Sequence, residues 1–211
     1  MGAVSVLSHK IRRKLHRAAI LTLQRFRVQA YRFLSWNRPH DDRSRRHQPV
    51  LLLGEGKVYL GRCSLGFWPS PYFLNGYIHI EARLPSAEVK IEDGVSINNN
   101  AVIIAECCKI SIGKNTLIGT EFTVYDSDFH DLHPERRMSG KAETAPVIIG
   151  DNVFIGSRVT VLKGAVIGNN TVIASGAVVT GIIPENCIAA GVPARVVGSV
   201  AGVLPSMESY R

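Results

Sequence analysis

The stretch IGDNVF IGSRVT VLKGAV IGNNTV IASGAV VT, residues 149–180, decides the fold of this 211-residue chain. An aliphatic residue opens each group of six, at Ile149, Ile155, Val161, Ile167, Ile173 and Val179. Gly and Asn recur between these positions, and both residue types tolerate the backbone angles of tight turns. Upstream, the same period is kept by two further sets of residues, which are Ile112, Ile118 and Val124, and, in another phase, Ile91, Ile97 and Ile103.

A period of six matches neither the period of about 3.6 of an amphipathic helix nor the two-residue alternation of a simple strand. It matches short strands that each end in a turn, so that every sixth side chain points inward. An ordinary sandwich of short strands would not hold one phase over six consecutive units. The sequence therefore predicts an all-β fold, a parallel β-helix with three hexads in each coil.

Three segments, residues 149–157, 168–180 and 190–197, resemble a known family. They are similar to the hexapeptide-repeat acyltransferases, and most of all to galactoside and maltose O-acetyltransferases and to relatives that modify surface polysaccharides. The resemblance covers about residues 90–198. It implies a left-handed winding, against the usual right-handed crossover rule. It also implies acetyl-CoA as the donor, a sugar acceptor, no metal, and a homotrimer whose sites each take residues from two chains.

A long polar loop, residues 125–146, interrupts the repeat between Val124 and Ile149. A long excursion from a tight coil usually serves a function. The loop contains histidines, and His is the favoured general base near neutral pH. In the resembled family this loop has a His followed ten positions later by Gly, with Pro and Arg between, and the matching residues here are His130, Pro134, Arg137 and Gly140.

By this resemblance His130 is the catalytic base, which deprotonates the acceptor hydroxyl as that hydroxyl attacks acetyl-CoA. Asn99 matches the Asn that contacts the acceptor in the family, and a role in a corner turn is its alternative. Asp128, His133 and Arg137 are the expected acceptor-binding residues, with His133 the second choice for the base. Either Asp128 or a backbone carbonyl orients the second ring nitrogen of His130, and the sequence leaves both open.

The donor site is expected on the later coils. Ser157 and Ser175 are eighteen residues apart, one full coil, so they should stack on the same face. With Thr180 they match family positions that line the CoA groove. Arg195 resembles an arginine placed near the nucleotide phosphates, where a guanidinium suits the ligand. Phe154 stands where relatives often have Trp and is expected to keep an apolar wall.

The formal charge of +8 is unevenly distributed. Residues 1–47 hold twelve Lys and Arg against two Asp, a balance of +10, which leaves −2 for the rest of the chain. Proteins that bind nucleic acid spread basic charge over the surface that contacts phosphate. Here the excess belongs to a leader, so we expect no nucleic-acid partner.

The cysteines and the apolar runs favour a cytoplasmic protein. The chain has four cysteines, none in a zinc-binding spacing, so reduced and mostly packed thiols are expected at Cys63, Cys107, Cys108 and Cys187. The apolar run at residues 18–23 is far too short to span a bilayer.

The leader contains an apolar stripe with a helical spacing, formed by Leu7, Ile11, Leu15, Ala18, Thr22, Phe26, Ala30 and Phe33. Two interpretations stay open. The helix packs on the β-helix or on a neighbouring subunit with its basic face solvated, or residues 1–36 bind an anionic membrane surface and hold the enzyme at the inner face of the membrane.

Four regions are predicted: a leader and linker at 1–47, with the linker at about 37–48; irregular first coils with an acceptor-side cap at 48–89; the acetyltransferase β-helix at 90–198; and a tail at 199–211. The second region holds an aromatic cluster, for which covering the open end of the coil is favoured over stacking on sugar, at Phe67, Trp68, Tyr72, Phe73 and Tyr77.

Several other functions are weighed against the sugar O-acetyltransferase. The enzyme alternatives are an N-acetyltransferase acting on an amino sugar and a serine-type small-molecule acetyltransferase. The non-enzyme alternative is a β-helix scaffold recruited to membranes. A γ-type carbonic anhydrase needs three zinc histidines, and His79, His130 and His133 do not form a persuasive set.

Overall fold

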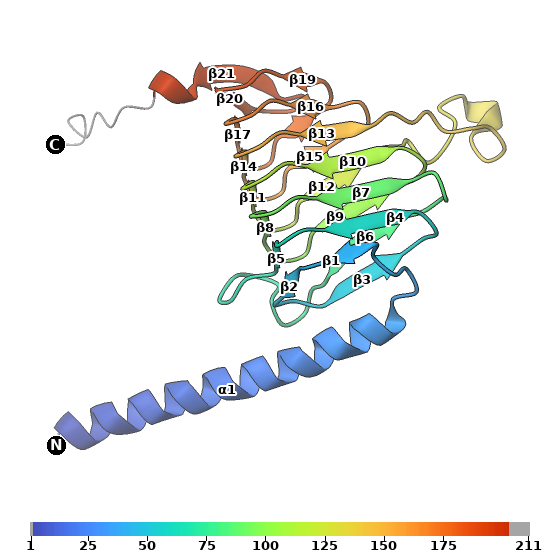
Figure 1. The fold of residues 1–211 in the computed structure, drawn as a ribbon. Helices are drawn as coiled ribbons and strands as arrows, with labels where there is room; N and C mark the ends of the chain where they lie inside the picture. Colours follow the sequence, from blue (N-terminus) through green and yellow to red (C-terminus); the bar gives the residue numbers. More distant parts are fainter. Residues whose placement is uncertain (1, 203–211) are drawn as a thin grey trace.

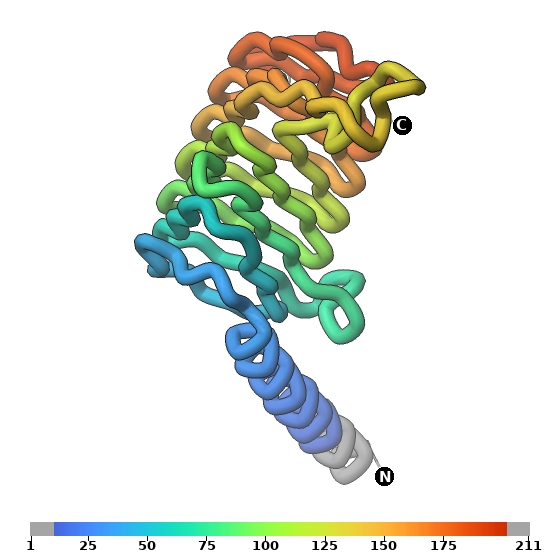
Figure 2. The backbone as a smooth tube through the Cα atoms, turned by 90° about the vertical axis from the view of Figure 1, so that its right-hand side faces the viewer, coloured from blue at the N-terminus to red at the C-terminus, as the bar shows by residue number. Residues whose placement is uncertain are grey.

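The computed structural model describes residues 2–202, with side chains from residue 11 onward. One long helix, α1 (Gly2–Leu34), precedes a parallel β-helix (Figure 1). The coils stack one on another, and the helix runs away from their base (Figure 2). Most of the predicted tail, residues 203–211, lies outside the described residues.

Each full coil gives one short strand to each of three sheets, which we name A, B and C in chain order. Sheet A contains β1 (Asp41–Asp42), β4 (Lys57–Leu60), β7 (Glu88–Ile91), β10 (Lys109–Ile112), β13 (Val147–Ile149), β16 (Val166–Ile167) and β19 (Ile182–Ile183). Sheet B contains β2 (Arg45–Arg46), β5 (Ser64–Leu65), β8 (Ser96–Ile97), β11 (Leu117–Ile118), β14 (Phe154–Ile155), β17 (Val172–Ile173), β20 (Cys187–Ala190) and β21 (Arg195–Ser199). Sheet C contains β3 (Val50–Leu53), β6 (Ile78–Ala82), β9 (Val102–Ala105), β12 (Thr123–Tyr125), β15 (Thr160–Val161) and β18 (Val178–Val179). Two short 3-10 helices are η1 (Pro134–Arg136) and η2 (Val200–Gly202).

The hexad period maps onto the coils as predicted. Residues eighteen apart are register partners in neighbouring coils, with one pair in each sheet: Ile149 and Ile167, Ile155 and Ile173, Val161 and Val179. All six side chains are buried. Three hexads per coil are therefore confirmed.

Asparagines form a ladder at the turn from sheet A to sheet B. Asn152, Asn170 and Asn186 have φ values of 54°, 57° and 58°, in the left-handed region that Asn tolerates better than most residues. Asn152 Nδ2 donates to Asn170 Oδ1 at 2.9 Å, and Asn170 Nδ2 donates to Asn186 Oδ1 at 3.0 Å. The expected role of Asn in the corner turns is thus confirmed here.

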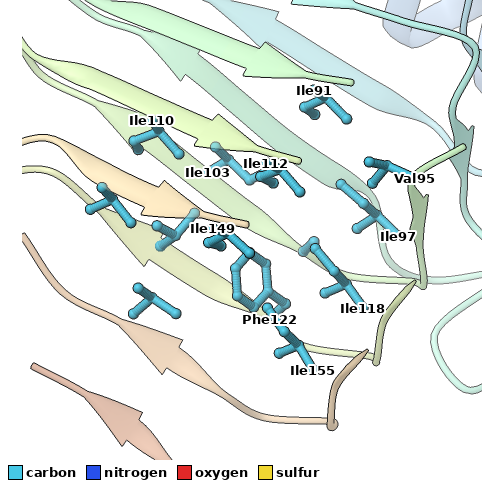
Figure 3. Packing of buried hydrophobic residues seen from close by; sticks show 14 of the residues in the cluster. Ile91, Val95, Ile97, Ile103, Ile110, Ile112, Ile118, Phe122, Ile149 and Ile155 are labelled. Atoms are coloured by element: carbon cyan, nitrogen blue, oxygen red, sulfur yellow. The ribbon is translucent and has the colours of Figure 1, made fainter. Parts of the chain in front are cut away.

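The core is a column of aliphatic side chains enclosed by the three sheets (Figure 3). The two hexad phases belong to this one column, because Ile91 pairs with Ile112 and Ile103 with Val124. Nine residues separate Ile103 from Ile112 where the period would give six. The three additional residues lie in the turn 106–108 between β9 and β10, which explains the change of phase.

The β-helix begins earlier than predicted. β1 and β2 lie inside the segment 37–48 that was expected to be a linker, and they pair in parallel with β4 and β5. Their side chains are polar and mostly exposed, so no aliphatic period marks them, and backbone pairing carries this coil. The region 48–89 is also more regular than expected, since only residues 66–77 leave the coil.

Helix α1 crosses the base of the β-helix and buries Ile20, Gln24 and Val28 there. These are not the residues of the predicted stripe, whose described members are exposed, while the Leu7 side chain lies outside the described part. The structure therefore corrects the face through which the helix packs. Within residues 2–202, no helix is both long and apolar enough to traverse a bilayer.

The segment 66–77 closes the base together with α1. Phe73 is buried beside Trp68, with ring centroids 5.3 Å apart, and Gln24 Nε2 donates to the Phe73 carbonyl at 2.7 Å. Tyr77 lies against Tyr31 of the helix, with ring centroids 5.2 Å apart. These contacts place Trp68, Phe73 and Tyr77 against the helix at the base, whereas Phe67 is 53% exposed.

Burial sets the reactivity of Cys63, one of four free cysteines. Desolvation raises the pKa of the Cys63 thiol to about 12. At pH 8 the folded protein then holds about 10³-fold less thiolate at this residue than the unfolded chain. We expect iodoacetamide to label Cys63 far more slowly in native protein than in urea, as measured by peptide mass spectrometry. Equal rates in the two states would show that the thiol is not shielded.

Candidate active site

The polar loop leaves the coil between β12 and β13, at the corner where sheet C turns into sheet A, and projects from the side of the molecule (Figure 1). Asp126, the first residue after β12, anchors it. The buried Asp126 carboxylate accepts the backbone N–H groups of Glu106, Cys107 and Cys108 at 2.6, 3.2 and 2.7 Å. The turn 106–108 in one coil thereby holds the start of the polar loop in the next coil.

The two limbs of the loop are tied together beside the coil. Ser127 Oγ donates to a carboxylate oxygen of Glu106. Lys163 Nζ lies 3.3 Å from Asp128 Oδ2 and 3.3 Å from Glu143 Oε2, on opposite limbs. The hydrogen bond with Glu143 raises the pKa of Lys163, so the ammonium group that bridges the limbs is stabilised. The base of the loop is therefore braced.

His130 is exposed on this loop. Its Nδ1 lies 3.2 Å from the carbonyl oxygen of Arg137. A carbonyl oxygen only accepts, so Nδ1 donates in this contact, and in the neutral ring the lone pair then lies on Nε2. A backbone carbonyl, rather than Asp128, is thus the group that orients the ring.

Gly140 lets the loop close on itself. A Cβ at this position would lie 2.2 Å from Asp131 Oδ2. That carboxylate is held in place, since Asp131 also accepts the backbone N–H of His133 at 2.8 Å and Arg136 Nε at 3.0 Å. The packing of the loop therefore explains why Gly stands ten residues after His130.

The three predicted acceptor-binding residues take different places. His133 and Arg137 are exposed on the same loop as His130. Arg137 Nη2 makes only a long contact, 3.4 Å to the Leu132 carbonyl, so its guanidinium remains available to a ligand. Asp128 instead faces Lys163 at the base of the loop.

Asn99 is fully buried in the turn between β8 and β9, where its amide holds the segment 66–77. Asn99 Oδ1 accepts the backbone N–H of Phe67 at 2.9 Å, and Nδ2 donates to the Phe67 and Pro71 carbonyls at 3.0 and 2.8 Å. These contacts use both amide hydrogens. The predicted contact with an acceptor is therefore corrected, because Asn99 supports a loop and presents no amide to a ligand.

Asn98, next to it, lines a shallow groove of about 220 Å³ on the outer face of sheet B. Phe67 forms one wall, while Leu117 and Phe154 from successive coils form the floor. Phe67, Leu117 and Phe154 are each about half exposed. Phe154 thus adds apolar surface to a groove that also contains one side-chain amide, and its place in a donor site stays a prediction.

Ser157 and Ser175 lie at the corner where sheet B turns into sheet C, in successive coils. Ser157 Oγ accepts from Thr120 Oγ1 at 3.1 Å, and its carbonyl accepts the N–H of Gly176 at 2.9 Å. The expected stacking of the two serines is confirmed. The corner is also open, because a Cβ added to Gly176 would meet nothing within 4 Å.

Arg195 lies further along the same side, where β21 pairs with Ala190 of β20. Its Nη1 donates to the Ala194 carbonyl at 2.9 Å. Thr180 does not join this group, because β18 separates it from the serine corner and places it at the corner from sheet C to sheet A.

Within one chain, the candidate base and the two donor-site serines lie at different corners. The loop with His130 leaves the corner from C to A, whereas Asn98, Ser157 and Ser175 lie at the corner from B to C. Sheet C stands between them. One chain thus does not bring the candidate base next to the candidate donor corner.

Sequence reasoning missed the residues that brace the loop and the groove. Asp126 and Lys163 are eighteen or more residues from the groups they hold, and Asn98 stands in a run of three asparagines in which nothing singles it out. The only signal for Asp126 is its place directly after a strand. Among the described residues, no group of three or more His, Cys, Asp or Glu side chains is arranged to hold a metal ion.

Comparison with known proteins agrees with this architecture. Residues 146–181 match the family model for the bacterial transferase hexapeptide (six repeats). The Saccharomyces cerevisiae protein named "Putative acetyltransferase YJL218W" is 36% identical over 152 residues, which cover 72% of each chain. This chain belongs to the hexapeptide-repeat acyltransferases. Its β-helix is left-handed, as that family implies.

Two further acyltransferases are informative. The galactoside O-acetyltransferase of Escherichia coli is 40% identical over 102 residues, 48% of this chain and 50% of that enzyme. A solved galactoside acetyltransferase in complex with coenzyme A is 31% identical, with a TM-score of 0.50, and the match covers 72% of this chain and 66% of that chain. The chain therefore spans only half to two thirds of the galactoside enzymes that it matches.

Proposed function

We propose that this protein transfers the acetyl group of acetyl-CoA to a hydroxyl group of a sugar. The observation that carries the proposal is the fixed orientation of His130, whose Nδ1 contacts the Arg137 carbonyl at 3.2 Å on a braced loop. The names of the galactoside enzymes that the chain resembles support a sugar as the acceptor.

The chemistry follows from the tautomer of His130. Nε2 removes the proton of the acceptor hydroxyl as its oxygen attacks the thioester carbonyl, and the new ester forms as the carbon–sulfur bond breaks. The departing CoA thiolate then takes the proton from the imidazolium. Transfer is direct, within a complex of both substrates, so a base and correct positioning are its main demands.

The serine corner suits the pantetheine arm of acetyl-CoA. Ser157 and Ser175 stack beside glycines, which leaves an open slot along the coils at Gly176. Arg195 stands further along this side as a partner for the nucleotide phosphates. The groove formed by Phe67, Asn98 and Phe154 opens on the adjoining face of sheet B.

The active form is a homotrimer in which the His130 loop of one chain meets the serine corner of its neighbour. This arrangement accounts for the placement of the two groups at different corners of one chain. A closed ring of three copies repeats the same contact three times and gives three equivalent sites.

The function is tested by measuring free-CoA release from acetyl-CoA with galactosides, maltose, glucosamine and serine as acceptors. We expect turnover with a sugar, and we expect the product to carry an O-acetyl ester detected by mass spectrometry. Acetylation of the glucosamine nitrogen or of serine would replace the sugar hydroxyl as the acceptor. No turnover with any acceptor would favour the scaffold hypothesis.

Shared sites are tested by mixing two inactive variants, His130→Ala and Ser175→Trp. Each lacks one half of the site, so mixed trimers should recover activity at up to about a quarter of their sites. Light scattering measures the oligomeric state of each sample. If trimers form but activity does not recover, both halves of the active site lie in one chain. The result of the acceptor assay does not depend on this outcome.

A further inference from the structure

We propose that the outer face of α1 docks on the surface of an anionic lipid membrane. The outer face is the apolar stripe that points away from the β-helix, formed by Ile11, Leu15, Ala18, Phe26 and Phe33. The proposal concerns where the protein resides and goes beyond its acyl transfer.

Helical geometry separates two apolar faces of α1. Ile20, Gln24 and Val28 follow one another at intervals of four and are buried. Ala18 and Phe26 stand two residues from Ile20 and Val28, and two residues turn a helix by about 200°. The outer face therefore lies opposite the packed face.

Contacts on the packed face fix which side of the helix is presented outward. Gln24 Nε2 donates to the Phe73 carbonyl at 2.7 Å. Arg27 reaches the same carbonyl through Nη1 at 3.1 Å and the Gly76 carbonyl through Nη2 at 2.8 Å. With Ile20 and Val28 buried beside them, the helix is held in one rotational setting on the base.

The outer face exposes large apolar side chains. Leu15 is 66% exposed, Phe26 73% and Phe33 88%. Trp36, just beyond the helix, is 71% exposed, and Trp favours the boundary between lipid and water. Large apolar side chains that are this exposed, on one face of a helix, indicate a surface that another body covers.

Charge identifies the occupant. Helix α1 contains eight Lys and Arg and no acidic residue. Arg12 borders the outer face on one side, and Lys14, Arg25 and Arg32 border it on the other, all of them exposed. An apolar stripe flanked by basic residues is the pattern of helices that lie in the interface of anionic membranes, where the long basic side chains reach the headgroups.

The same charge argues against a second copy of this helix as the occupant. Two outer faces packed together would bring the basic rows of both helices side by side with no acid between them. Residues 48–211 have a balance of only −2, so a second copy of the chain also offers little net negative charge to this helix.

The test compares binding of the full-length protein to vesicles of phosphatidylcholine alone and of phosphatidylcholine with phosphatidylglycerol. The decisive variant is Leu15→Gln/Phe26→Gln, which changes the outer face and leaves the packed face intact. The matched control is Ile148→Gln/Ile182→Gln, which changes two exposed apolar residues on sheet A. Truncation of the helix is unsuitable, because it would remove Gln24 and Arg27, which hold the segment 66–77 through the Phe73 and Gly76 carbonyls.

We expect wild type and control to sediment with the anionic vesicles and not with the neutral ones, and more weakly as salt rises. The outer-face variant should lose at least about tenfold in partition coefficient. In a Trp68→Phe background, Trp36 is the one remaining tryptophan, and its emission should shift to the blue on anionic vesicles.

Two results would overturn the proposal. One is equal binding of wild type and the outer-face variant to anionic vesicles, or no binding of either. The other is a lower mass by light scattering for the outer-face variant without lipid, which would make this face a contact between copies of the chain. If only membrane docking fails, the outer-face variant keeps the acetyltransferase activity of wild type with a soluble acceptor.

Discussion

Replacing His130 with alanine is expected to lower kcat by about 10²-fold or more, the usual scale for loss of a general base. The Arg137 carbonyl orients the His130 imidazole through Nδ1. This contact leaves Nε2 to accept the hydroxyl proton. KM for acetyl-CoA should change little, because the proposed contacts of acetyl-CoA are the serine corner and Arg195, and not His130. Steady-state assays of CoA release measure both constants.

His133→Ala is the matched control for this variant. His133 is exposed on the same loop, but its backbone N–H, not its ring, makes the contact with Asp131. It should keep most of the activity. Because the His130 side chain is exposed, added imidazole should also restore part of the rate of His130→Ala. Equal kcat in wild type and His130→Ala would remove the residue from the mechanism.

Replacing Asp126 with asparagine is expected to lower the free energy of unfolding by about 3 kcal/mol, since hydrogen bonds to a charged acceptor contribute about 1.5–3 kcal/mol each. The carboxylate accepts three backbone N–H groups in the turn 106–108. An asparagine would turn an NH₂ group toward at least one of these donors. For a chain of this length, Tm should fall by about 6–12 °C.

Asp128→Asn is the matched control, because Asp128 is partly exposed and interacts with Lys163 near the surface. Its cost should stay below about 1 kcal/mol. Thermal unfolding followed by circular dichroism compares the two variants. If both melt at the same temperature as wild type, the three contacts of Asp126 contribute nothing measurable.

The hexad period made the fold predictable, because every sixth side chain must enter the same column in every coil. Ile149, Ile155 and Val161 therefore indicate three sheets without any knowledge of distant contacts. The first coil was not predictable in this way. β1 and β2 carry polar side chains without an aliphatic period, and their pairing depends on backbone groups that every sequence has.

The candidate site was predictable in its residues and less so in its geometry. The spacing from His130 to Gly140 is a local property of one loop, so the sequence carries it. The contacts of Asn99 are not local, since its partners lie about thirty residues away in a segment without a repeat. Asn98 and Asn99 therefore could not be told apart until that segment was placed.

The leader shows a further limit of sequence patterns. Its apolar stripe was predicted, but the packed face uses Ile20 and Val28 together with the polar Gln24. A glutamine at the centre of a buried face weakens the apolar pattern of that face. It is tolerated there because its amide donates a hydrogen bond to the Phe73 carbonyl. Helical periodicity gives the faces, and tertiary contacts decide which one is covered.

The ends of the coil also determine how far the stack can extend. A stack of parallel strands leaves unpaired backbone groups at its first and last strands, and such edges can recruit further copies into filaments. Here Asn37 Nδ2 donates to the Gly54 and Gly56 carbonyls at the first end, and β21 pairs antiparallel with β20 at the last. An antiparallel strand runs in the wrong direction to continue the parallel pairing with another coil. These contacts at the two ends of the β-helix thus oppose end-to-end polymerisation.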